Sequence, residues 1–228
     1  HSTEIIKRLT NGKLFAFDQD EDVKMNSLSN KNFKLLNANF RHIKKFLRLE
    51  GINKFDGLLA DLGISSYQID TPERGFSYQQ EGPLDMRMDD RNPLTAAMIL
   101  NTWSEKQLGE IFFKYGDIKR YRTLTKAIIQ TREKKPFKTT KDLTDFLHQT
   151  IKGKRQHHHP ATLIFQALRI AVNDELGVIE RHLFEFLSLL KPGGRLGVIS
   201  FHSGEDRLIK HLFRQAAKEG IGPVSDNP

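Results

Sequence analysis

The 228-residue chain has no cysteine, a single tryptophan and no apolar run near the length of a membrane span. The absence of cysteine excludes a disulfide scaffold, a cysteine nucleophile and a thiolate zinc site. About 18 consecutive apolar residues are needed to cross a bilayer, so the sequence predicts no membrane segment. Hydrophobic residues make up 38% of the chain and charged residues 28%, which is the composition of a globular protein with a buried core.

Several catalytic motifs are missing as well. The sequence has no G-x-S-x-G elbow, no Walker loop and no H-E-x-x-H pair, so hydrolase and phosphotransferase functions lack support. His157-His158-His159 is a run of potential metal ligands, but three consecutive residues do not converge easily on one ion. We therefore predict no metal site.

The net charge of +8 is concentrated in one segment. Residues 119–155 hold twelve Lys and Arg but only three Asp and Glu, whereas the rest of the chain is nearly neutral. Such a segment is typical of a surface that binds a polyanion, and equally of a solvated helical surface. The charge pattern alone leaves both interpretations open.

The distribution of apolar residues predicts an α/β fold. Short apolar runs separated by helical patterns indicate a parallel sheet; they lie at 14–17, 34–38, 55–62 and 195–201. The run at 55–62 is almost continuous, which predicts a strand covered on both faces. Lys191-Pro192-Gly193-Gly194 is predicted to end a helix and form a turn before the last strand.

The stretch from about residue 71 to 155 does not follow this alternation. Its patterns are helical and predict an insertion into the sheet domain; they lie at 94–100, 105–115, 123–132 and 141–151. A long amphipathic helix is predicted over 161–190, with an interruption near 173–177.

Two acidic residues stand where predicted strands end. Asp18 is placed to accept both ribose hydroxyls of an adenosine cofactor, as carboxylates at strand ends do. A turn or helix cap within Asp18-Gln19-Asp20 is the alternative, and no glycine-rich loop precedes it. Asp61 is followed by Gly63, which permits close backbone approach by a ligand. Helix capping by Asp61 or Ser65 is the alternative there.

His202 follows the last predicted strand and therefore lies on the same edge of the sheet as the two acids. An imidazole at this edge is suited to act as a base, a hydrogen-bond donor or a substrate contact. Ser203 is the predicted N-cap of the next helix, with Glu205 and Asp206 in its first turn. That assignment leaves His202 without a structural role.

Longer motifs resemble one known family, the ribosomal small-subunit RNA methyltransferase H family, also called MraW. The resemblance spans nearly the whole chain in several motifs that keep the family's order; they lie at 55–68, 73–77, 82–88, 159–176 and 192–207. It implies a class I S-adenosylmethionine-dependent methyltransferase with a Rossmann-like, mostly parallel sheet and an inserted helical domain. The implied reaction is N4-methylation of a cytidine in the decoding region of 16S rRNA.

The resemblance also implies a cofactor site for S-adenosylmethionine. The family's contacts fall on His1, Asp18, Phe40, Asp61 and Gln68. Asp18 would hold the ribose, Phe40 would pack near the adenine, and Asp61 and Gln68 would lie nearer the methionine end. Gly204 departs from the family pattern, which usually has Leu there.

The implied domain organisation is discontinuous. We expect residues 1–85 and 156–228 to form the methyltransferase domain, truncated at both ends, and residues 86–155 to form a helical insertion that recognises RNA. The expected partner is small-subunit rRNA or the ribosomal subunit, in the cytoplasm and without a membrane. The sequence leaves the oligomeric state open, with a dimer among the alternatives.

The chemistry requires a group that aligns the cytosine amine and accepts its hydrogens, because the N4 lone pair is delocalised into the ring. Asp61 is the favoured catalytic residue and His202 the second candidate. The target base must be unpaired to enter a pocket. Pro83–Met88 are predicted either to line that pocket or to form a packed connection to the helical insertion. Two other functions stay open: methylation of an exocyclic amine on DNA, and a non-catalytic RNA-binding ribosome assembly factor.

Overall fold

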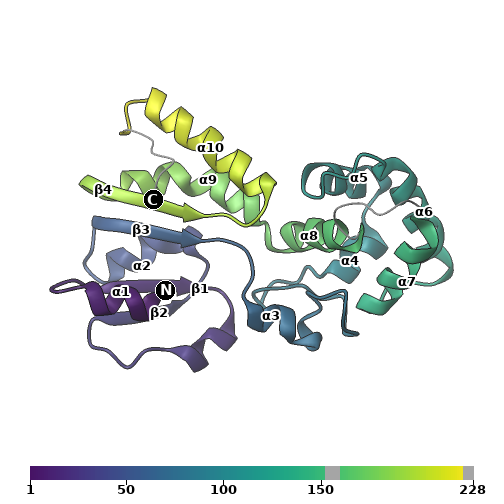
Figure 1. Cartoon of the computed structure of the whole chain (residues 1–228), viewed down its shortest axis with the longest axis horizontal. Coiled ribbons are helices and arrows are strands. Elements are labelled where there is room, and N and C mark those ends of the chain that lie inside the picture. The colour runs from purple at the N-terminus through teal and green to yellow at the C-terminus, as the bar shows by residue number, and fades with distance from the viewer. Residues whose placement is uncertain (152–159, 223–228) are drawn as a thin grey trace. The chain divides into compact units, whose positions relative to one another are not determined.

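The computed structural model describes residues 1–151 and 160–222 (Figure 1). His157, His158 and His159 lie outside the described residues. The chain divides into two compact units. The first comprises His1–Leu58, Met88–Arg91 and Phe184–Leu196, and the second Leu59–Arg87, Asn92–Leu183 and Gly197–Pro228.

The first unit is built around a two-stranded parallel sheet. Strands β1 (Leu14–Asp18) and β2 (Phe33–Asn37) pair in register, with Leu14 opposite Phe33 and Asp18 opposite Asn37. Around them lie α1 (Ser2–Arg8), η1 (Glu21–Asn26), η2 (Phe40–His42) and α2 (Ile43–Leu49). The two strands predicted from the sequence are confirmed.

The core of this unit is aliphatic and aromatic. Ile43 and Leu47 of α2 pack with Phe186 and Leu189, and Phe17 lies against this cluster. The apolar positions of α2 fall four residues apart, so they share one helix face and pack against the sheet.

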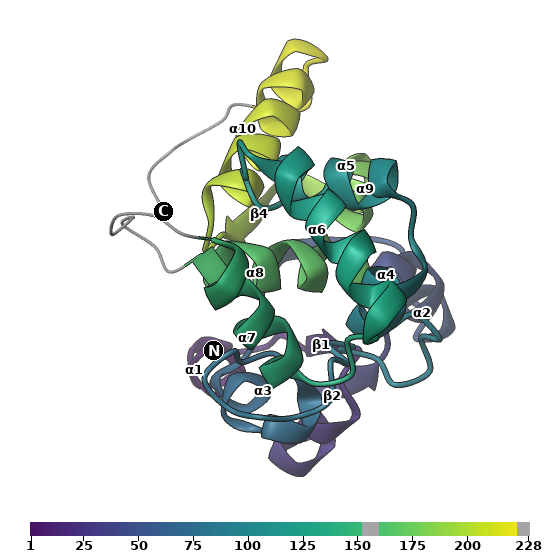
Figure 2. The ribbon, with the colours of Figure 1, turned by 90° about the vertical axis from the view of Figure 1, so that its right-hand side faces the viewer.

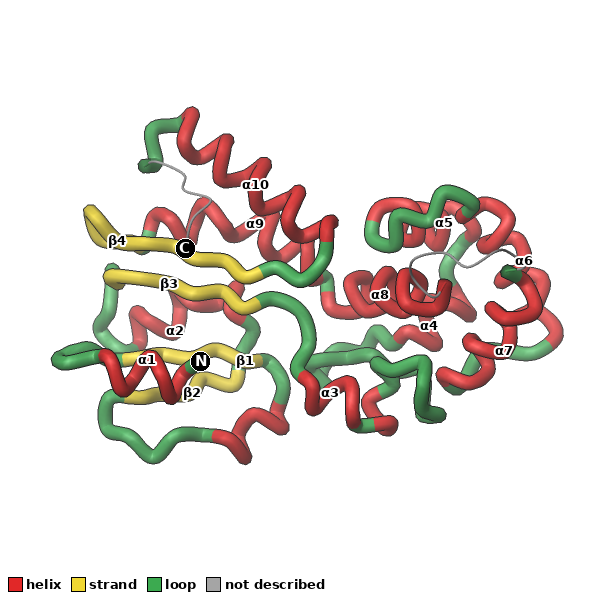
Figure 3. The backbone as a smooth tube through the Cα atoms, viewed as in Figure 1, coloured by secondary structure: helices red, strands yellow, loops and turns green. Residues whose placement is uncertain are grey.

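A second sheet pairs β3 (Phe55–Asp61) with β4 (Leu190–Ile199). Figure 3 shows the strands in yellow, and the arrows of β3 and β4 in Figure 1 point the same way. Bonds from the Phe55 N–H to the Leu189 carbonyl and from the Leu62 N–H to the Ile199 carbonyl fit this parallel pairing. The expectation of parallel strands is thus confirmed.

Two sequence expectations about these strands are wrong. Lys191-Pro192-Gly193-Gly194 belongs to β4 and does not form a separate turn. A Cβ on Gly194 would lie 3.0 Å from the Asp56 carbonyl oxygen, so the glycine lets the backbone of β3 run alongside. In β3, half-buried Leu58 and Ala60 alternate with exposed Leu59 and Asp61. The pleat leaves one face of the strand open, so the strand is not covered on both faces.

Helices dominate the second unit (Figure 2). They are α3 (Ser66–Asp70), η3 (Pro72–Arg74), α4 (Ala96–Thr102), α5 (Glu105–Lys114), α6 (Tyr121–Lys134), α7 (Thr140–Thr150), α8 (Pro160–Asn173) and α10 (Ser203–Lys218). Helix α9 (Glu175–Ser188) begins in this unit and ends in the first. Asp174, with a φ of +52°, separates α8 from α9 as expected from the sequence.

Helix α8 packs against α4, α5 and α7, so it lies in the same unit as the helices of the predicted insertion. The division into units therefore differs from the predicted domain boundaries at 85/86 and 155/156. The functional assignment of those domains stays a prediction.

The segment Pro83–Met88 is a packed connection. Leu84 and Met86 are 1% and 0% exposed, and the Asn173 side-chain amide donates a hydrogen bond of 2.7 Å to the Met86 carbonyl. The interpretation of this segment as a pocket wall gains no support from Leu84, Met86 and Met88, because these side chains are already buried.

Candidate active site at the ends of β3 and β4

Asp18 ends β1 in an Asx turn. Its Oδ1 atom accepts a hydrogen bond of 2.9 Å from the Asp20 N–H, and Asp20 in turn caps η1. The Asn37 amide donates to the carbonyls of both Asp18 and Asp20. The local turn that the sequence offered as an alternative is therefore present. A carboxylate has about four acceptor positions, so this turn is compatible with a ribose contact.

Two other predicted cofactor contacts lie in the first unit. Phe40 packs on Phe186 with ring centroids 5.8 Å apart, at the edge of the core cluster. His1 is exposed and precedes α1, and its carbonyl accepts the Ile5 N–H. Their roles toward a cofactor stay predictions.

Asp61 is exposed at the carboxyl end of β3. The next residue, Leu62, is bonded to Ile199 of β4 over 3.1 Å, which fixes the start of the loop. Gly63 then adopts a φ of +90°, a conformation that side-chain-bearing residues rarely adopt. A Cβ on Gly63 would lie 3.4 Å from the ring of Phe201, so the loops that follow β3 and β4 are in contact.

The loop after Gly63 enters α3 through a capping box. The Ser65 hydroxyl accepts the Gln68 N–H over 3.2 Å, and the Gln68 side-chain oxygen accepts the Ser65 N–H over 3.0 Å. The alternative that Ser65 caps a helix is thus confirmed. Gln68 is 6% exposed, and its predicted contact with a cofactor is untested by this arrangement.

His202 caps α10, which corrects the assignment of Ser203 as the cap. The ring Nδ1 accepts the Glu205 N–H over 3.3 Å. As an acceptor Nδ1 carries no proton, which places the proton of the neutral ring on Nε2. That atom lies 3.2 Å from Glu205 Oε1, within ion-pair distance but without the alignment of a hydrogen bond.

Glu205 ties the loop after β4 to the helix that follows. Its Oε2 atom accepts the Phe201 N–H over 2.9 Å, and the side chain is 1% exposed. Burial opposes ionisation, but His202, the Phe201 N–H and Arg169 outweigh it and lower the pKa of Glu205.

A second buried ion pair joins α8 to α9. Arg169 of α8 donates two hydrogen bonds of 2.9 and 3.0 Å to Glu175 of α9. Burial raises the pKa of Glu175, and the facing Arg169 offsets part of that increase. This network was not predicted from the sequence. Its signal was an arginine and a glutamate within otherwise apolar helical stretches, where unpaired charge is costly.

The structure brings Asp61, Gly63, Gln68 and His202 into the second unit, and places His1, Asp18 and Phe40 in the first. Among residues 1–151 and 160–222, no group of His, Asp and Glu is arranged to hold a metal ion. No helix within those same ranges is long and apolar enough to span a membrane. The second unit therefore presents a carboxylate and a fixed histidine where two parallel strands end.

The sequence matches the MraW methylase family over residues 1–225. The chain belongs to this family. A relative from Flavobacterium johnsoniae named ribosomal RNA small subunit methyltransferase H is 48% identical, covering 96% of this chain and 73% of the relative. Relatives of the same name from Cytophaga hutchinsonii and Carboxydothermus hydrogenoformans are 49% and 45% identical, covering 96% and 98% of this chain and 74% and 73% of their own lengths.

Membership in the MraW family confirms the predicted fold class, a class I S-adenosylmethionine-dependent methyltransferase with parallel strands and helices. It also confirms that the chain is a methyltransferase. The chemistry of two predicted contacts is compatible with this cofactor, since Asp18 is a carboxylate at a strand end and Phe40 an aromatic residue that begins η2. Their contacts with the cofactor stay predictions.

Proposed function

We propose that the chain transfers a methyl group from S-adenosylmethionine to N4 of a cytidine in the decoding region of 16S rRNA. The family match over residues 1–225 carries this proposal. The exposed carboxylate of Asp61, beside a glycine loop at the end of a parallel strand, supports it. The proposed rRNA substrate supports the predicted cytoplasmic location, which stays part of the proposal.

In this proposal Asp61 aligns the amine. When bound, S-adenosylmethionine supplies an electrophilic methyl group on a sulfonium sulfur. Asp61 accepts a hydrogen bond from the N4 amino group, which directs the nitrogen lone pair toward that methyl group. Transfer of that methyl group to the nitrogen would make the amino group acidic. The carboxylate then stabilises the developing charge and takes up the released proton.

The family resemblance supplies the residues proposed to hold the cofactor. Asp18 accepts the ribose hydroxyls, Phe40 packs near the adenine, and Gln68 lies nearer the methionine end. His1 belongs to the same predicted set. His202 is kept as the second catalytic candidate, although its Nδ1 atom is engaged in capping α10.

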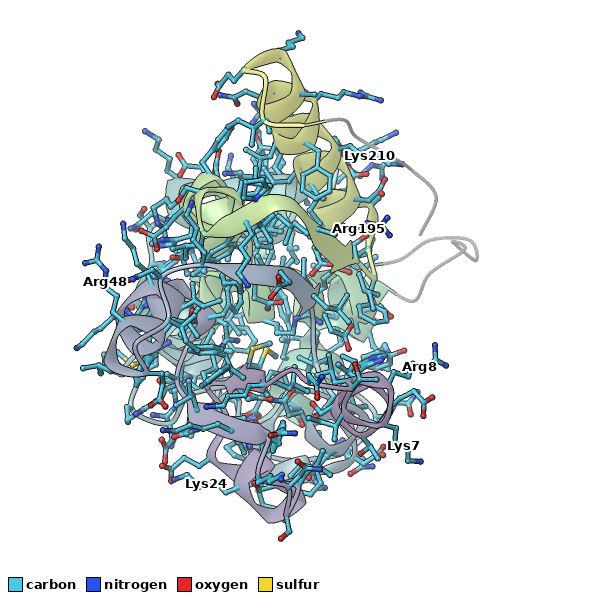
Figure 4. The ribbon with its side chains drawn as sticks, turned by 90° about the vertical axis from the view of Figure 1, so that its left-hand side faces the viewer. Lys7, Arg8, Lys24, Arg48, Arg195 and Lys210 are labelled. Atoms are coloured by element: carbon cyan, nitrogen blue, oxygen red, sulfur yellow. The ribbon has the colours of Figure 1, made fainter. Side chains whose placement is uncertain are left out.

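Affinity for rRNA would come from the basic segment, residues 119–155, of which the structure describes 119–151. Elsewhere basic side chains are often paired with acids. Figure 4 labels Arg8, Lys24 and Lys210, which pair with Glu4, Glu21 and Asp206. Within the segment, Arg120 is the N-cap of α6 and Lys126 lies in that helix, and both side chains are exposed. Basic side chains of this kind bind phosphates irrespective of sequence.

The test is methyl transfer from labelled cofactor to small-subunit particles and to naked rRNA, followed by nucleoside analysis. We expect label in N4-methylcytidine. Asp61→Asn should lower kcat by about 10²- to 10⁴-fold, the usual contribution of a general base. Asp56→Asn is the matched control. Asp56 is an exposed acid of the same strand, and its carboxylate pairs with Lys191. This substitution should leave kcat unchanged.

The alternatives predict different products. Label transferred to single-stranded DNA but not to rRNA would replace the proposal with a DNA methyltransferase. Tight rRNA binding without any transfer of label would indicate a non-catalytic assembly factor. A wild-type rate in Asp61→Asn would remove Asp61 from the chemistry while leaving the reaction class intact.

A further inference from the structure

An exposed aromatic cluster lies where α5 ends and α6 begins, on elements separate from the strand ends. Phe113 of α5 is 60% exposed. Its ring centroid lies 5.6 Å from that of Tyr121 in α6, with the two planes tilted by 56°. The guanidinium carbon of Arg122 lies 5.2 Å from the centre of the Tyr121 ring. Two rings and a cation therefore form one continuous surface, which we call the aromatic cluster.

The aromatic cluster is held on rigid helices. A Cβ on Gly109 would lie 3.0 Å from two atoms of the Tyr121 ring. The absence of a side chain at this position of α5 therefore leaves room for the ring to pack against the helix. Beneath it, Leu108 and Phe112 of α5 and Leu124 of α6 are 0%, 0% and 4% exposed. Because these side chains lock the two helices together, Phe113 is presented at the surface in a fixed place.

The surroundings of the aromatic cluster are basic. Residues 114–126 contain five basic side chains and one acid, Asp117, a net charge of +4. All six side chains are exposed, the basic ones being Lys114, Lys119, Arg120, Arg122 and Lys126. One exposed ring, Phe113, beside the half-buried ring of Tyr121 and surrounded by cations is a poor match for an apolar protein surface. It matches an unpaired nucleotide, which has a flat base and a charged phosphate.

We propose that Phe113, Tyr121 and Arg122 form a stacking platform for an unpaired base of the RNA substrate. The proposal rests on the proposed rRNA methyltransferase function and adds a contact site to it. The base lies against the face of Phe113, and Arg122 and its basic neighbours hold the adjacent phosphates. Because the platform is built from α5 and α6, it affects binding of RNA and not the methyl-transfer step.

Phe113→Leu tests the stacking, because leucine keeps apolar bulk but has no π-face. The probes are single-stranded oligouridylate and inorganic polyphosphate of similar charge. We expect the variant to bind oligouridylate about 5- to 150-fold more weakly, the fold-change that corresponds to loss of one base–aromatic stack. Its affinity for polyphosphate should be unchanged. Leu49→Ala, which shortens a 73% exposed side chain of α2, is the control and should alter neither affinity.

Phe113→Trp tests the same contact spectroscopically. Wild type carries one tryptophan, Trp103, so the variant adds a single reporter at the platform. Oligouridylate should quench the fluorescence of the variant much more than that of wild type, and polyphosphate should quench neither. Equal quenching in the two proteins would overturn the proposal, as would equal affinity of wild type and Phe113→Leu for oligouridylate.

Steady-state methyl transfer separates this proposal from the proposed function. With rRNA as substrate, Phe113→Leu should raise KM by the same factor as the loss of affinity and leave kcat unchanged. If wild type transfers no methyl group to rRNA but Phe113→Leu still weakens oligouridylate binding, the proposed function fails and the platform stands. If wild type methylates rRNA and the KM of the variant is unchanged, only the platform fails.

Discussion

A histidine ring at the end of a strand can act as a base or can hold the backbone in place, and His202 has the contacts of the second kind. Its Nδ1 atom accepts a backbone N–H of α10, and its ring edge faces the buried carboxylate of Glu205. Glu205 also accepts the Phe201 N–H, so the two residues together fix the loop that follows β4. We infer a positioning role that the residue type alone does not reveal.

We predict that asparagine can replace this histidine, because its side-chain oxygen also caps helices. His202→Ala should lower the free energy of unfolding by about 1 kcal/mol, as loss of an N-cap does. His202→Asn should recover most of that stability and a kcat near that of wild type, with an unchanged pH profile. The measurements are urea unfolding and methyl transfer as a function of pH.

If His202 is instead a general base, the outcome differs. His202→Asn would then fold normally but lose about 10²- to 10⁴-fold in kcat, and the acidic limb of the pH–rate profile would disappear. Ser203→Ala serves as the control, because its side chain does not supply the α10 cap in the structure.

Among the elements, the start of α7 shows how one helix end gathers several polar contacts. Asp142 completes a capping box with Thr139 and also accepts the Lys138 N–H. Its Oδ1 atom lies 2.6 Å from Lys135 Nζ. Burial opposes ionisation, but these contacts outweigh it and lower the pKa of Asp142 to about 2. The ionised carboxylate is therefore favoured in the folded protein.

This shift gives a pH dependence of stability. Because the folded pKa of about 2 lies below the ordinary value of 3.8, the contribution of Asp142 is present above pH 3.8 and is lost as the pH falls toward 2. Asp142→Asn should therefore destabilise the protein at neutral pH, and its difference from wild type in the free energy of unfolding should shrink across that interval. Urea unfolding at a series of pH values measures it.

The control for this prediction lies one turn along the same helix. Asp145 pairs with Lys141, but both side chains are more than half exposed. Exposed ion pairs contribute about 0–1 kcal/mol, so Asp145→Asn should cost much less at neutral pH. A difference between wild type and Asp142→Asn that stays constant down to pH 2 would contradict the role assigned to Asp142.

At the scale of the whole molecule, the structure refines which charges of the basic segment are available to RNA. Lys135 and Lys141 are paired with Asp142 and Asp145, and Arg132 donates to the carbonyls of Leu100 and Trp103. These side chains have structural partners, which reduces the number of basic side chains that are available to bind phosphate.

We predict that glutamine at exposed Lys119, Arg120, Lys126 and Lys134 weakens RNA binding and flattens its salt dependence. Each lost phosphate contact should reduce the slope of log affinity against log salt by about 0.7–0.9. A double variant of the ion-paired Lys135 and Lys141 should change the slope less. Oligonucleotide affinity across a salt series measures both, and identical slopes for the quadruple variant and wild type would show that the segment is only a solvated surface.

The sequence by itself determined the parts of this protein that depend on local pattern. Apolar runs located the four strands seen in residues 1–151 and 160–222, and spaced apolar residues located α4 to α7. The spacing of apolar side chains follows the backbone conformation, because one face of each element is buried. Asp61 followed from the end of a strand, and the family followed from motifs along the chain. Cofactor contacts and catalytic roles stay predictions, because no local pattern reports what a side chain touches.

Only the tertiary structure decided the contacts between segments distant in sequence. Ser203 is the better N-cap by residue type, but the backbone after β4 places the His202 ring at the N-terminus of α10, where it accepts the Glu205 N–H. Lys191–Gly194 contains turn formers, but pairing with β3 extends the strand through them. Phe113 meets Tyr121 because α5 and α6 bury their apolar faces together. In each case packing between elements outweighs the local preference, because it buries more surface and satisfies more backbone groups.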